Sequence, residues 1–206
     1  MVSAQTNART QRSTVLALAT CAAITFFLTP AASQDFPQAK GPARTVKMFS
    51  FFCLSHLPDL EGVKQAAGFG EFAQIDAKDL EQYQPAVRAD ELHAWSFHDH
   101  GAKYVLTAAR AKPDDAFKQQ EPKFAGATSF ACSLRIPTAD NPPDGVVKEL
   151  TALLGEAPGK AWTEGDFKVH VWTKKADKIM SLMHYYAPLP GKDAKGLLSA
   201  GVYVRK

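Results

Sequence analysis

The sequence predicts an α+β domain with a mostly antiparallel sheet of about five to seven strands and two main helices packed on it. Two observations carry this prediction. Short segments that alternate apolar and polar residues, or are rich in β-branched and aromatic residues, are separated by tight turns. Two other segments begin with helix start signals and end at glycine, and the second also places apolar residues along one helical face. Strands joined by short turns pair antiparallel, and helices can then cover a face of the sheet.

The first 33 residues have the three-part pattern of a cleavable secretory signal. Arg9 and Arg12 are its only charged residues, residues 15–28 are all apolar or small, and small residues follow. That apolar run is shorter than the ~20 residues of a permanent membrane helix. We therefore expect a periplasmic or secreted protein with no stable transmembrane segment after processing. Two alternatives stay open: an uncleaved membrane anchor, and a lipid-attachment box ending at Cys21.

Removal of 33 residues from 206 leaves 173, which suits one domain. Residues 34–44 lack an apolar period and predict a flexible lead-in, so residues 45–206 form the single α+β domain. The net charge of +3 falls to +1 when the two signal arginines leave. Because no block of like charge stands out, nucleic acid is not an expected partner.

The first half of the domain opens with residues 45–52, which are β-branched and aromatic and predict a strand. Residues 58–67 predict a helix, because Asp59 and Glu61 lie in its first turn and complement the helix dipole. A second, short helix is expected over residues 76–83.

Three strands follow in the sequence. Residues 92–98 and 103–110 flank a Gly-containing turn and predict a hairpin. The polar residues 111–127 predict a loop. Residues 128–136 alternate with a period of two, which places Cys132 on the buried face.

The second half repeats the order of one helix and three strands. Residues 145–154 carry apolar side chains along one helical face, and Gly155 follows them. The three expected strands are 167–174, 178–187 and 198–205. The order indicates a pseudo-repeat of helix plus three strands in topology, without obvious sequence identity between the halves.

Two cysteines remain after the signal leaves, Cys53 and Cys132. An even pair in an oxidising compartment predicts a disulfide. The alternative is a pair of buried free thiols. Cys53 also has His56 three residues away, as a thiol nucleophile and its base would, but a disulfide would consume the thiol.

Histidines gather in the hairpin from His93 to His100. His98 and His100 would share a strand face, which is a metal-site spacing, but zinc needs three or four ligands. We therefore expect an exposed hairpin tip, with no metal and no cofactor. The same hairpin is the site of the alternative function, an unrecognised periplasmic enzyme of hydrolase type.

The last sheet region carries the candidate binding face. His170 and Trp172 alternate with apolar residues, and pairing across the following turn brings them near Met183 and Tyr185. An aromatic and polar strand face of this kind could bind a partner protein, a peptide or a small apolar ligand. The alternative is that the two helices cover this face.

A set of short motifs resembles small exported two-cysteine proteins of proteobacteria. They are Phe51-Phe52-Cys53 before a helix, Trp95 in a hairpin, Phe130-Ala131-Cys132, and a helix that ends in Leu153-Leu154-Gly155. The resemblance implies export and the disulfide, and it implies no catalytic residue. Together with the residue patterns it favours an exported soluble domain that acts by binding and not as an enzyme.

Overall fold

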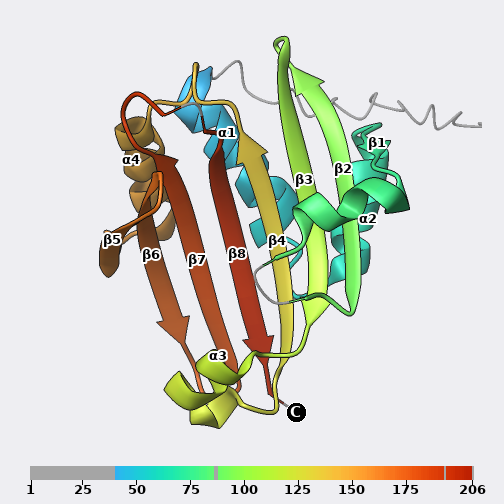
Figure 1. The fold of residues 1–206 in the computed structure, drawn as a ribbon, viewed down its shortest axis with the longest axis vertical. Helices are drawn as coiled ribbons and strands as arrows, with labels where there is room; N and C mark the ends of the chain where they lie inside the picture. The colour runs from blue at the N-terminus through green and yellow to red at the C-terminus, as the bar shows by residue number, and fades with distance from the viewer. Residues whose placement is uncertain (1–39, 86–87, 193, 206) are drawn as a thin grey trace, which may run out of the picture. The chain divides into compact units, whose positions relative to one another are not determined.

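The computed structural model describes residues 40–85, 88–192 and 194–205, so the predicted signal peptide lies outside the described residues. One antiparallel sheet of eight strands forms its centre, in the order β1-β2-β3-β4-β8-β7-β6-β5 (Figure 1). The strands are β1 (Ala73–Gln74), β2 (Glu91–Asp99), β3 (Ala102–Ala111), β4 (Thr128–Ile136), β5 (Lys160–Glu164), β6 (Phe167–Lys175), β7 (Ile179–Pro188) and β8 (Gly196–Val204). The predicted α+β class and the antiparallel sheet are confirmed.

The sheet consists of two halves with the same strand order from edge to centre. Strands β1 to β4 form one half, β5 to β8 form the other, and the halves meet where β4 pairs with β8. Six of the predicted strands are present. The two short edge strands, β1 and β5, were not predicted, because both consist of exposed residues that show no buried alternation.

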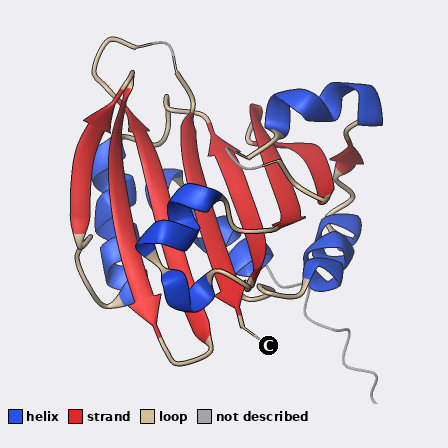
Figure 2. Cartoon of the chain, turned by 60° about the horizontal axis from the view of Figure 1, so that its bottom comes forward, coloured by secondary structure: helices blue, strands red, loops and turns tan. Residues whose placement is uncertain are grey.

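Helices lie on both faces of the sheet (Figure 2). One face, called here the helical face, is covered by α1 (Gly41–Phe49), the π-helical turn Ser50–Leu54, α2 (Leu60–Phe69) and α4 (Pro143–Leu154). The opposite face carries α3 (Asp115–Gln120) and the 3-10 turn Pro122–Phe124, which lie in the segment that was predicted to be a loop. Phe117 of α3 stacks on Tyr203 of β8 with ring centroids 4.0 Å apart.

The prediction of a strand over residues 45–52 is wrong, because this segment is helical. Its composition is typical of a strand, but its buried residues do not alternate. Thr45, Met48, Phe49 and Phe52 are buried at the spacing of one helical face. Pro42 stands in the first turn of α1, where proline is favoured. The helix begins at Gly41 and therefore also shortens the predicted flexible lead-in.

The predicted helices α2 and α4 are present with clear end signals. The side chain of Asp59 accepts a hydrogen bond from the backbone N–H of Glu61 at 3.1 Å, which caps α2. Gly155 ends α4 with a left-handed φ of 74°, which favours glycine at this position. The short helix predicted over residues 76–83 is a 3-10 turn, Ala77–Tyr83. Among the described residues, no helix has the length and apolar character that a membrane span requires.

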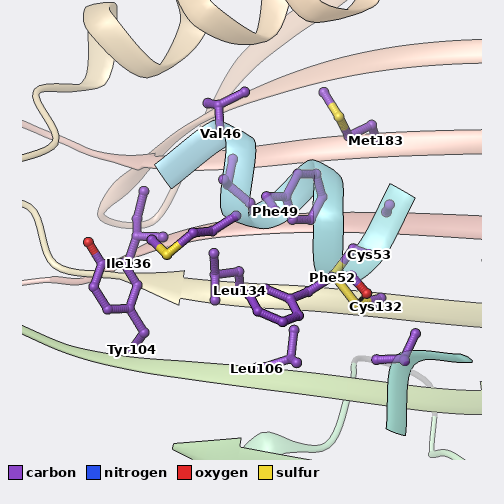
Figure 3. Close-up of a cluster of buried hydrophobic side chains, with 14 of the residues drawn as sticks. Val46, Phe49, Phe52, Cys53, Tyr104, Leu106, Cys132, Leu134, Ile136 and Met183 are labelled. Carbon is purple, nitrogen blue, oxygen red and sulfur yellow. Dashed lines mark hydrogen bonds between the residues drawn. A yellow bond between two sulfur atoms is a disulfide. The ribbon is translucent and has the colours of Figure 1, made fainter. Parts of the chain in front are cut away.

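The main core lies between the helical face of the sheet and the helices that cover it (Figure 3). Phe49 and Phe52 from the first helical segment pack toward Leu106 of β3 and Leu134 of β4, and all four are buried. Cys53 and Cys132 form a disulfide with a Cα–Cα distance of 5.3 Å, which confirms the predicted pair. The disulfide joins the turn after α1 to the middle of the sheet, so the helical layer is tied covalently to β4.

Candidate functional site

A cavity of about 580 Å³ lies where α4 begins, beside the start of β6 and the end of β7. Three segments that are distant in the sequence form its walls. Its apolar lining residues are Pro142, Pro143, Ala187, Pro188, Leu189 and Pro190, and its polar side chains are Thr138, Asp144, Lys168, His170 and Lys192. Mostly apolar walls with a few polar groups are typical of small-molecule sites, which measure about 300–1,000 Å³.

His170 is the buried polar group of this cavity. It lies in β6 on the helical face, directly opposite Tyr185 of β7, and only 9% of the residue is exposed. Its Nδ1 atom has no hydrogen-bond partner among the described residues. Burial lowers the pKa of His170, the positive charge of Lys168 lowers it further, and Asp144 offsets part of this effect. At neutral pH the imidazole is therefore neutral, and it can accept or donate a hydrogen bond.

Two further buried atoms that have no hydrogen-bond partner in the described part of the chain lie close to this cavity in the fold. They are the hydroxyl of Tyr185, which pairs with His170 across β6 and β7, and the Oδ1 atom of Asn141, which precedes the lining residue Pro142. Burial raises the pKa of the Tyr185 hydroxyl, and the charge of Asp144 adds to the effect, so this group stays protonated. Buried polar atoms in folded proteins usually have hydrogen-bond partners. Three buried polar atoms without a described partner therefore lie at or near this cavity, on His170, Tyr185 and Asn141.

The charged groups of the cavity are only partly paired. Lys192 forms an ion pair with Asp166 at 2.8 Å. Lys168 and Asp144 form no ion pair with any residue in the described ranges. Asp144 stands in the first turn of α4, where a carboxylate complements the helix dipole. Lys168 has no such structural role, and it leaves a free ammonium beside His170.

The four residues of the predicted binding face do not form one open groove. The predicted pairing is present, with His170 opposite Tyr185 and Trp172 opposite Met183. Trp172, Met183 and Tyr185 are buried on the helical face, and the Trp172 Nε1–H donates to the backbone oxygen of Glu156 at 3.0 Å. Trp172 and Met183 line a second, smaller cavity of about 160 Å³. Of the four residues, only His170 lines the large cavity.

The histidines of the first hairpin are not brought together. His93 faces the helical side and its Nε2 atom hydrogen-bonds to Glu91 Oε1 at 3.0 Å. His98 is exposed on the opposite face, and His100 is exposed in the turn with a φ of 48°. Asp99 accepts two hydrogen bonds from Arg44, at 2.6 and 2.7 Å. Within the described ranges, no group of three or more His, Cys, Asp or Glu side chains could hold a metal ion.

The thiol of Cys53 is not available as a nucleophile, because its sulfur is bonded to Cys132. The predicted alternative of a Cys53 and His56 pair therefore has no thiolate in the oxidised protein. The predicted binding face included His170 but none of the proline-rich walls of the cavity. Pro142 and Pro143 announce the predicted helix, and Pro188 and Pro190 end a predicted strand. Nothing in their local pattern indicates that the fold brings them together.

Comparison of this chain with models of protein families, with curated proteins and with solved structures finds no match. The resemblance to small exported two-cysteine proteins therefore stays a prediction.

Proposed function

We propose that this chain is an exported domain that binds a small organic ligand in the cavity beside α4. The observation that carries the proposal is the state of His170, which lines the cavity, is nine-tenths buried, and has an Nδ1 atom without a partner among the described residues. A buried polar atom of this kind costs about 1–3 kcal/mol if it stays unpaired. Because Nδ1 is closed to solvent, a polar group of a ligand would supply the missing hydrogen bond after a turn of the ring.

The walls of the cavity support a small ligand more than a large protein partner. The prolines and Leu189 offer apolar contact area, and they surround His170 in a concave site instead of a flat surface. Protein interfaces are broader and flatter, about 800 Å² on each partner. Of the three ligand classes that the sequence favours, the cavity therefore suits the small, partly apolar molecule best.

Export is supported by the pattern of residues 1–33 and by the disulfide, since disulfides persist in oxidising compartments. Intact-mass measurement of protein from an extracytoplasmic fraction tests this part. We expect a chain that starts near Gln34 and is lighter by two hydrogen atoms than its reduced form. A full-length chain in that fraction would contradict cleavage of the signal.

Ligand binding is tested with three probes of equal length, 1-hexanol, hexanoate and hexylamine. We expect at least one of them to shift the NMR signals of the His170 ring in the wild-type protein. Thr138→Trp should abolish the shift, because Thr138 lines the cavity and the indole fills it. Thr173→Trp is the matched control, since Thr173 is exposed on the opposite face of β6. If no probe moves the His170 signals, the proposed function is wrong.

A further inference from the structure

The two halves of the sheet share a short motif at the same place. The first long strand of each half carries His-x-Trp followed by a hydroxyl residue: His93-Ala94-Trp95-Ser96 in β2 and His170-Val171-Trp172-Thr173 in β6. Both histidines and both tryptophans point to the helical face. The ring centroids of the pair are 5.9 Å apart in β2 and 6.4 Å apart in β6.

The residue two positions before the histidine differs in charge between the copies. In β2 it is Glu91, whose carboxylate binds both the His93 ring at 3.0 Å and the Arg110 guanidinium at 2.9 Å. In β6 it is Lys168, which has no acceptor to offer. The first copy is thus a closed group of an imidazole, a carboxylate and a cation. The second copy has the imidazole and a cation, but its own strand supplies no carboxylate.

The missing partner in the second copy coincides with the large cavity. His170 and Lys168 both line this cavity, whereas neither His93 nor Glu91 lines any of the cavities described here. In β2 the bound ring atom is Nε2, and in β6 the ring atom without a partner is Nδ1, which is closed to solvent. The comparison of the two copies therefore indicates which chemical group a ligand of this cavity would contribute.

We infer that the cavity takes an apolar monocarboxylic acid, whose carboxylate lies between His170 and Lys168 as the Glu91 carboxylate lies between His93 and Arg110. This inference rests on the proposed function and adds the ligand class to it. Charge-assisted hydrogen bonds from an ammonium and an imidazole to a carboxylate are the strong kind. The apolar chain of the acid then contacts the proline walls formed by Pro142, Pro143 and Pro188–Pro190.

The other charges at the site are compatible with one carboxylate. Lys192 faces the cavity and shares its charge with Asp166. Asp144 also faces the cavity from the first turn of α4. Its negative charge raises the pKa of His170, whereas the charge of Lys168 lowers it. The ammonium of Lys168 would repel a cationic ligand at this position. Asp144 would repel the second carboxylate of a diacid, so the site favours an acid with one carboxylate.

The test is calorimetric titration of the wild-type protein with hexanoate, 1-hexanol and hexylamine. We expect hexanoate to bind at least tenfold more tightly than 1-hexanol, and hexylamine to bind most weakly. Lys168→Glu places a carboxylate two positions before His170, as Glu91 stands before His93, with Ala187 opposite it where β2 has Arg110. It should therefore remove the tenfold preference for hexanoate. Lys178→Glu is the matched control, because it makes the same charge change at an exposed turn residue away from the cavity. Circular dichroism of both variants checks that they fold.

The possible results separate the two proposals. A tenfold preference for hexanoate that is present in the wild-type and Lys178→Glu proteins and absent in Lys168→Glu supports the inference. If 1-hexanol or hexylamine binds as tightly as hexanoate, or if folded Lys168→Glu keeps the preference, the carboxylate assignment is overturned and the cavity remains a ligand site. If none of the three probes binds, both the ligand class and the proposed function are overturned.

Discussion

The disulfide should supply a large share of the stability of this domain. It joins residues 79 positions apart and closes a loop of about 80 residues. The chain-entropy relation for such a loop gives about 15 cal/mol/K, or about 4.5 kcal/mol at 25 °C. Because folded domains are stable by only about 5–15 kcal/mol, loss of this crosslink should bring the protein close to unfolding.

Two perturbations measure this contribution independently. One is chemical reduction of the wild-type protein, and the other is the double variant Cys53→Ala/Cys132→Ala, which also removes two fully buried sulfur atoms from the core. Urea denaturation followed by circular dichroism should show a loss of about 4 kcal/mol on reduction and a larger loss in the variant. The reductant should have no effect on the variant. If reduction of the wild-type protein changes the free energy of unfolding by less than about 1 kcal/mol, the loop-closure reasoning is refuted.

Three further predictions concern single residues. Trp172→Ala should lower the free energy of unfolding by about 3–5 kcal/mol, because the side chain is 3% exposed and its Nε1–H is bonded to Glu156; an unchanged urea midpoint would contradict its place in the core. Asp99→Asn should lower the free energy of unfolding by about 1 kcal/mol, because it weakens a partly buried ion pair in which Arg44 donates two hydrogen bonds to Asp99. Thermal unfolding measures this loss, and equal melting temperatures of the variant and the wild-type protein would argue against a stabilising pair. As the pH falls from about 7 to about 5, the free energy of unfolding should decrease more in the wild-type protein than in His170→Gln. The pKa of His170 in the folded protein lies below the ordinary value of 6.5, so the unfolded chain takes up the proton first. Urea midpoints of the two proteins that change in parallel across this range would count against the lowered pKa.

The strands of this fold could be predicted where one face is buried and turns are tight. Residues 128–136 alternate strictly, and β4 has those bounds. The two edge strands could not be found in this way, since every residue of β5 is exposed and its strand conformation depends on pairing with β6. Helix α1 was mistaken for a strand because aromatic and β-branched residues fit either state. Only the spacing of its buried residues distinguishes the two, and burial is a tertiary property.

The candidate site was predictable only in part, for a similar reason. The alternation around His170 placed this residue on one strand face, and the pairing with Tyr185 followed from a short turn. The walls of the cavity come from the start of α4 and from the loop after β7, and these meet only because β7 and β6 lie beneath α4. The contrast between Glu91 and Lys168 becomes informative only when the sheet order shows that they occupy equivalent strands.

The most direct test of the account is the protonation of His170, measured by NMR titration of its ring signals with and without hexanoate. In the free protein we expect a pKa below that of an ordinary histidine, because the ring is buried and Lys168 lies nearby. A bound carboxylate stabilises the imidazolium, so hexanoate should raise that pKa and shift both ring signals. If hexanoate leaves the pKa and the ring signals of His170 unchanged, the carboxylate assignment is contradicted, and if 1-hexanol and hexylamine also leave them unchanged, the central claim of a ligand site is contradicted.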